Sequence, residues 1–92
     1  MIACEDNCCR IAGAVTVDSV GGVLRELQPQ LAKGVDTLDF SGVESADSAA
    51  LALIFSAMRQ ARQVGRTLAL SGLPASFTTL AELYGVAELL PA

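Results

Sequence analysis

Ser48 is the residue of this sequence whose position best suits chemistry, because its hydroxyl stands where a loop changes into a helix. Asp47 precedes it, and a helical pattern of apolar residues begins at Ala49. Side-chain oxygens at such a place can accept the N–H groups that the first helical turn leaves unpaired. The same N–H groups and the helix dipole would also stabilise a phosphoserine. Ser48 can therefore cap the helix, contact a partner or carry a phosphate.

Two carboxylates accompany this serine in the sequence. Asp39 and Asp47 could form an acid–base pair, but their simpler role is to order the loop around Ser48, together with Ser41. Close together, they would disfavour a phosphate by repulsion. The chain has no histidine, no plausible pair of cysteine nucleophiles and no glycine-rich phosphate loop. We therefore predict no catalytic residues and a protein that is not an enzyme.

The cysteines give no sign of a metal centre. Cys4, Cys8 and Cys9 are an odd number, which does not suggest a disulfide framework in a small intracellular chain. A structural zinc site would need four ligands from Cys and His, and His is absent. We expect three separate thiols, no bound metal and no cofactor.

The composition bounds the class of protein. Ninety-two residues make one domain, residues 1–92, and 52% hydrophobic against 4% aromatic residues implies an aliphatic core. A net charge of −4 without a basic cluster argues against binding to nucleic acid or to anionic lipid. No apolar run approaches the roughly 20 residues of a membrane span, and no signal peptide is recognisable. The sequence predicts a cytoplasmic protein without direct membrane insertion.

The secondary structure follows from apolar periodicity and turn residues. Asp6-Asn7 favours a tight hairpin turn between two short strands. Pro29 should kink the first helix or end it early. The predicted strands cover residues 2–5, 8–12, 35–40 and 66–71, and the predicted helices cover residues 18–33, 48–64 and 76–84.

This order of elements predicts an α/β fold. Two strand–helix–strand passages require parallel strands, and the hairpin at the start makes the β-sheet mixed. About three helices are available to cover it. Because the chain is short, we expect one sheet face to be covered and the other to be partly open or screened by a partner.

The helix after Ser48 has a predicted inner and outer side. Its apolar stripe should join the central strands in one core made of Leu38, Phe40, Leu51, Ile54, Phe55, Met58, Leu68 and Leu70. Leu53 lies off this stripe, near Ala49 and Ser56. Together with Asp47 and Ser48, these residues predict a weakly polar patch that a partner's helix can contact.

The stretch around Ser48 resembles a known family. Asp39-Phe40-Ser41, followed by Asp47-Ser48-Ala49-Ala50-Leu51, is similar to the pattern of STAS domains, in which a strand leads through a loop to a hydroxyl residue at a helix start. The resemblance covers nearly the whole chain and implies a SpoIIAA-like sheet. Ala50 departs from the family, which usually has glycine there, and this narrows the approach of a kinase to the backbone.

The resemblance implies a partner. The run at residues 80–86 and the Leu90-Pro91 ending look most similar to the STAS subunit of ABC transporters that move phospholipids and maintain outer-membrane lipid asymmetry. That similarity implies contact with the cytoplasmic ATPase subunit through Ser48 and a location peripheral to the inner membrane. The alternative is a partner-switching antagonist that binds an anti-sigma factor kinase until Ser48 is phosphorylated. Such antagonists commonly have a longer final helix, which favours the transporter.

Overall fold

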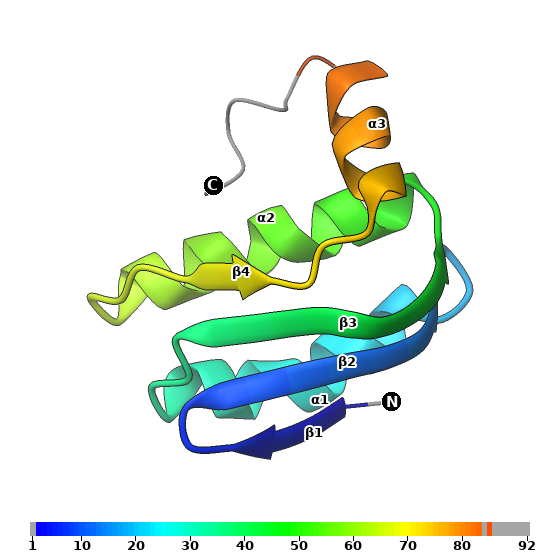
Figure 1. Cartoon of the computed structure of the whole chain (residues 1–92). Helices are drawn as coiled ribbons and strands as arrows, with labels where there is room; N and C mark the ends of the chain where they lie inside the picture. The colour runs from blue at the N-terminus through cyan, green and yellow to red at the C-terminus, as the bar shows by residue number, and fades with distance from the viewer. Residues whose placement is uncertain (1, 84, 86–92) are drawn as a thin grey trace.

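The computed structural model describes residues 2–83 and 85 of the chain (Figure 1). Four strands and three helices follow one another, and each predicted element is present. They are β1 (Ile2–Glu5), β2 (Cys8–Val15), α1 (Val20–Ala32), β3 (Thr37–Ala46), α2 (Ser48–Gln63), β4 (Ala69–Ser71) and α3 (Ala75–Leu83).

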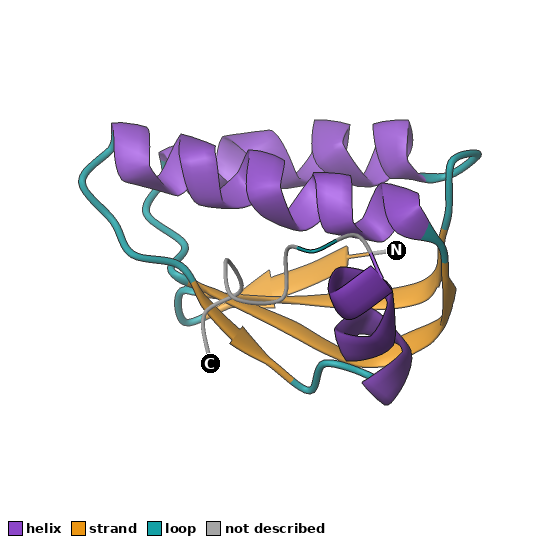
Figure 2. Cartoon of the chain, turned by 90° about the horizontal axis from the view of Figure 1, so that it is seen from above, coloured by secondary structure: helices purple, strands orange, loops and turns teal. Residues whose placement is uncertain are grey.

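The strands form one mixed sheet in the order β1-β2-β3-β4. β1 and β2 are antiparallel, whereas β2, β3 and β4 are parallel to one another. α1 and α2 lie side by side on one face of this sheet (Figure 2). On the other face the strands present side chains that are exposed or half-buried, among them Ala3, Glu5, Arg10, Asp39 and Ser71. The predicted hairpin, the two strand–helix–strand passages and the partly open face are confirmed.

The two central strands are longer than predicted. β3 continues past Ser41 through Gly42 to Ala46, so the loop expected between Ser41 and Asp47 is a strand. Register shifts in the β2–β3 ladder at Ala12 and Ala14 accommodate this extension as bulges. A Cβ on Gly42 would lie only 3.1 Å from the Cβ of Ala12. Gly42 therefore permits close strand pairing, and the prediction that the strand ends at Phe40 was wrong.

The start of α1 is held by a turn and not by a cap. Ser19 occupies the N-cap position, but its side chain makes no cap hydrogen bond to the helix. Its Oγ accepts from the Thr16 N–H at 3.0 Å and donates to the Ala14 carbonyl at 2.8 Å. At the other end the helix runs through Pro29 to Ala32, so the predicted early end does not occur.

The buried side of α2 is rotated from the predicted side. Its buried residues are Ala50, Leu51, Leu53, Ile54, Ala57 and Ala61. The Gln60 side chain donates to the Gln28 carbonyl of α1 at 3.2 Å, and Leu53 lies on the same side of the helix as Gln60, seven residues earlier. Leu53 has no exposed surface. The prediction that it faces outward was wrong, because α1 of the same chain occupies the place expected for a partner's helix.

The remaining core predictions mostly hold. Leu38, Phe40, Ile54 and Leu68 belong to the core, and Met58 and Leu70 pack against it while partly buried. Phe55 is half-buried and is not part of the core cluster. The small side chains of Ala50, Ala57 and Ala61 are fully buried on the inner side of α2. Their size lets α2 approach the sheet closely.

Two of the cysteines are joined, contrary to the expectation of three thiols. Cys4 and Cys9 form a disulfide across the β1–β2 hairpin, where they are direct partners with Cα atoms 4.0 Å apart. The two-residue turn at Asp6 and Asn7, both with positive φ, sets this register. Cys8 faces the opposite side of the sheet and is free. Counting cysteines could not reveal a pairing that the hairpin register creates.

The last helix closes one end of the core. Phe77 of α3 is buried, and its ring centroid lies 5.4 Å from that of Phe40 in a tilted arrangement. The predicted continuation of this helix to Tyr84, and the ending at residues 86–92, lie outside the described residues. No helix in the described part of the chain has both the length and the apolarity that crossing a membrane requires.

Candidate functional site

Asp47, and not Ser48, caps α2. Asp47 has extended backbone angles at the N-cap, and its Oδ1 accepts from the Ala49 N–H at 2.8 Å. Its backbone carbonyl accepts from the Ala50 N–H at 2.9 Å. Ser48 is the first helical residue, and its side chain is exposed. Within the described residues no hydrogen bond involves the Ser48 hydroxyl, so the expectation that it caps the helix was wrong.

Asp47 also fastens the neighbouring loop. Its Oδ2 accepts from the Val17 N–H at 3.1 Å, and its own N–H donates to the Val15 carbonyl at 3.2 Å. One carboxylate thus joins the start of α2 to the loop between β2 and α1. These hydrogen bonds fix the position of Ser48, and none of those among the described residues uses its hydroxyl.

We expect Asp47→Ala to lower the free energy of unfolding by about 1–2 kcal/mol, because it removes the cap and the bond to Val17. Ser48→Ala should change this free energy by less than about 0.5 kcal/mol, since Ala is a good helix former and no hydrogen bond is lost. Urea denaturation of both variants checks the assignment. A larger loss for Ser48→Ala than for Asp47→Ala would show that Ser48 is the cap.

The surface beside Ser48 differs from the predicted patch. Leu53 is buried, whereas Ala49 and Ser56 are half-buried on the flank toward α1. The outward side of α2 instead carries Ser48, Ala52, Phe55 and Arg59, at helical spacing. The apolar stripe assigned Phe55 to the core, whereas the structure leaves it half-buried on the side of α2 that carries Ser48.

Asp39 and Ser41 lie apart from Ser48. Both are in β3, and the Asp39 Oδ1 accepts from the Ser41 N–H at 2.9 Å. Asp39 and Asp47 are eight positions apart in the sequence, which corresponds to roughly 25 Å of extended strand. The predicted role of Asp39 and Ser41 in ordering a loop around Ser48 was therefore wrong. Instead, Asp39 and Ser41 pack against the backbone of Gly72, the residue that follows β4.

The charge of Asp39 is stabilised locally. The Ser41 N–H, and after it the Ser41 hydroxyl, lower the pKa of the Asp39 carboxyl, and the Arg10 guanidinium adds to this effect. The Arg10 Nε lies 3.8 Å from the Asp39 Oδ2, with a largely exposed arginine side chain. Such an ion pair contributes little to stability. Asp39 is thus a negatively charged acceptor within the sheet.

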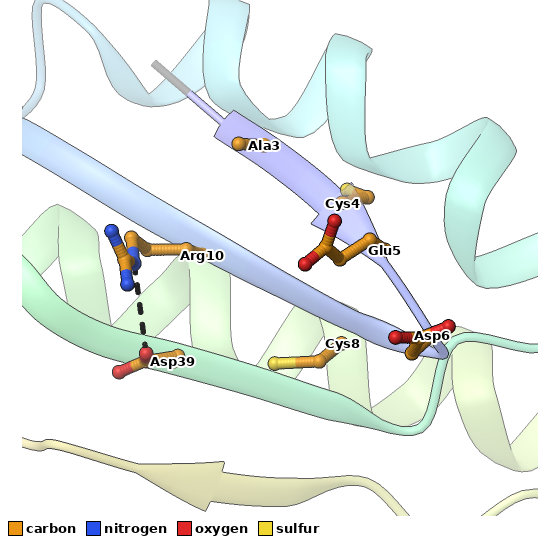
Figure 3. Close-up of a pocket in the computed structure, with 7 residues that line it drawn as sticks. All are labelled: Ala3, Cys4, Glu5, Asp6, Cys8, Arg10 and Asp39. Atoms are coloured by element: carbon orange, nitrogen blue, oxygen red, sulfur yellow. Dashed lines mark ion pairs between the residues drawn. The ribbon is translucent and has the colours of Figure 1, made fainter.

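A depression of about 480 Å³ lies on the uncovered face of the sheet (Figure 3). Its lining residues are Ala3, Cys4, Glu5, Asp6, Cys8, Arg10 and Asp39. In the close-up the Arg10 side chain extends toward Asp39, and Asp6 lies at the hairpin turn. These residues come from β1, β2, their turn and the first part of β3. The depression is therefore separate from the helix start at Ser48.

The comparison with protein families identifies the fold family. A family model described as MlaB, STAS domain, matches residues 3–91. The chain belongs to the STAS domain family. No curated protein matches this STAS domain.

Solved structures of other proteins share this fold. A crystal structure from Thermotoga maritima, of a protein assigned as an anti-sigma factor antagonist, matches with a TM-score of 0.75 and 17% identity, over 98% of this STAS domain and 81% of that chain. The anti-sigma factor antagonist SpoIIAA in its unphosphorylated form matches with a TM-score of 0.68 and 14% identity, over 99% and 84% of the two chains. At such identities the likeness shows the fold alone.

The site of this STAS domain is only partly the predicted one. The structure brings Asp47, Ser48 and Ala49 together, while Leu53, Asp39 and Ser41 lie elsewhere. It adds Val17, which sequence analysis missed. The only sequence sign for Val17 was an apolar residue in a segment that was expected to be a turn before a helix.

Proposed function

We propose that this STAS domain is a non-catalytic subunit of an ABC-type phospholipid transport system, where it binds and regulates or stabilises the cytoplasmic ATPase subunit. One observation carries the proposal. The Ser48 hydroxyl is exposed at a rigidly held helix start, yet it has no structural task in the described part of the chain. The family model, which is described by the name MlaB, supports this choice of partner.

The surroundings of Ser48 favour a contact over a phosphate. The N–H groups of Ala49 and Ala50 already donate to Asp47. A phosphate on Ser48 would lie next to the Asp47 carboxylate and would find these two donors occupied. A partner's polar group can approach the neutral hydroxyl without this repulsion. The proposed location, peripheral to the inner membrane, follows from the partner and not from the chain itself.

The alternative is an anti-sigma factor antagonist that phosphorylation of Ser48 switches off. This alternative is retained because the two matching structures are of proteins assigned as antagonists, and they share the fold over nearly the whole chain. Both functions are non-catalytic and use the same helix start. They differ in the partner and in the need for phosphorylation.

We expect Ser48→Asp to fold normally and to lose the ATPase subunit. The helix dipole favours a carboxylate in the first helical turn and the neighbouring Asp47 opposes it, so the two effects offset and the domain should unfold within about 1 kcal/mol of wild type. At an interface the added charge must be desolvated, which should weaken binding at least about tenfold. Co-purification from cells and titration of the purified ATPase subunit measure both effects. Ser48→Thr should bind like wild type.

Gln63→Glu is the matched control, since it adds the same charge at the far, exposed end of α2. Normal binding by Ser48→Asp would refute the proposed contact. Recovery of a kinase-type anti-sigma factor and no ATPase would establish the alternative. Phosphate on Ser48, detected by mass spectrometry of the protein purified with that kinase, would support the switch.

A further inference from the structure

Val17 is an exposed apolar residue beside Ser48. It has 72% of its surface exposed, although most large apolar side chains of the described chain are buried or half-buried. It lies in the loop between β2 and α1. A single exposed valine is ordinary on a protein surface. The position of Val17, and not its exposure alone, makes it notable.

The loop of Val17 is tied to the start of α2. The Val17 N–H donates to Asp47 Oδ2 at 3.1 Å, while Asp47 Oδ1 caps α2 through Ala49. Val15 and Ala46 are register partners in the sheet, so both segments leave neighbouring strands at the same edge. The Val17 backbone is thus held beside the start of α2 by a hydrogen bond to the Asp47 carboxylate, and Ser48 is the next residue after Asp47. An exposed apolar residue and an exposed hydroxyl residue therefore both adjoin Asp47.

The charge around this pair has one sign. We define the Ser48 end as residues 14–19 and 44–52, which contain the carboxylates of Asp18, Glu44 and Asp47 and no Lys or Arg. Both α1 and α2 begin here, so the N-terminal ends of two helices lie at this end of the sheet together with these carboxylates. Asp18 and Glu44 are exposed. A complementary surface must therefore offer Lys or Arg side chains around an apolar recess.

We propose that Val17 is the apolar anchor of the interface at Ser48, and that it inserts into a recess ringed by basic side chains on the ATPase subunit. This inference rests on the proposed function and adds the chemistry of the partner surface. A second copy of the chain fits poorly, because two Ser48 ends would bring carboxylates together. Burial of Val17 should slow dissociation of the complex, and the surrounding carboxylates should speed its association.

The test measures binding of the purified ATPase subunit to the full chain by surface plasmon resonance. We expect Val17→Asp to weaken binding at least about tenfold and Val17→Ala several-fold. Val64→Asp is the matched control. Val64 is 48% exposed and follows the last residue of α2, about 24 Å from Ser48 along the helix axis. It should bind like wild type. Glu44→Gln should lower the association rate, and added salt should lower it for wild type as well.

Each outcome separates this inference from the proposed function. Val17→Asp binding like Val64→Asp overturns the anchor, and the proposed function survives if Ser48→Asp still loses the partner. Loss by Val17→Asp with normal binding by Ser48→Asp supports the anchor and refutes the Ser48 contact. Sedimentation could also show that the wild-type chain self-associates and that Val17→Asp abolishes this. Such a result would assign the surface to a second copy of the chain and overturn the proposal.

Discussion

Leu53→Ala should lower the free energy of unfolding by about 2–5 kcal/mol, the range for truncating a buried leucine. Leu53 is fully buried on the side of α2 that faces α1, as the bond between Gln60 and Gln28 shows. Truncation would leave a cavity where the two helices and the sheet meet. Because alanine retains helix propensity, the loss reports packing and not helix formation. Urea denaturation monitored by circular dichroism gives the value.

Phe55→Ala is the matched control for this prediction, since it removes a larger side chain two residues away in the same helix. Phe55 is half-buried and lies outside the core cluster. Its truncation should therefore cost clearly less than that of Leu53. If Phe55→Ala proves the more destabilising change, the helix is rotated toward the orientation predicted from the apolar stripe, and Leu53 would face outward after all.

Gly72→Ala should destabilise the domain by about 2–4 kcal/mol. Gly72 has a φ of +65°, which costs an L-residue roughly 1–2 kcal/mol. A Cβ would also lie 2.8 Å from the Ser41 nitrogen and 2.9 Å from the Asp39 Oδ1. These two atoms form the hydrogen bond inside β3, so the methyl group would push apart a bonded pair. The expected loss exceeds that from backbone conformation alone.

Gly65→Ala isolates the conformational part of this effect. Gly65 has a similar φ of +75°, but nothing lies within 4 Å of the position that a Cβ would take. We expect it to cost about 1 kcal/mol, because only the left-handed backbone is penalised. Thermal unfolding of both variants gives the difference. Equal losses of stability in the two variants would mean that β3 can move away from the new methyl group at no cost in free energy.

The elements of the fold could be predicted because their determinants are local. Asp6-Asn7 fixed the hairpin, and both residues have the positive φ that such a turn needs. The change of apolar period near Ser48 placed the start of α2 correctly. The strand after Phe40 was missed, because Gly42 allows β3 to pair closely with β2 at Ala12, and this contact joins segments that are distant in the sequence. The length of a strand depends on its pairing with the neighbouring strand, so a local sequence pattern does not predict it.

The candidate site was harder to predict for the same reason. The apolar stripe was centred on the large side chains of the helix, so it placed Phe55 inside and Leu53 outside. The choice between Leu53 and Phe55 depends on where α1 packs, which a single helix does not reveal. Likewise, either Asp47 or Ser48 could supply the capping oxygen, and only the backbone angles of Asp47 decide between them. Val17 became visible only through its bond to Asp47.

The division of labour between Asp47 and Ser48 has a consequence for how this site can evolve. Stability at the helix start depends on residue 47, whereas the exposed side chain of residue 48 makes no hydrogen bond within residues 2–83 and 85. Substitutions at position 48 therefore drift nearly free of a folding penalty and are filtered by recognition alone. A lineage can retune or lose its partner by a single change at Ser48 while the domain stays folded. Position 47 has no such freedom, and the two adjacent codons should evolve at very different rates.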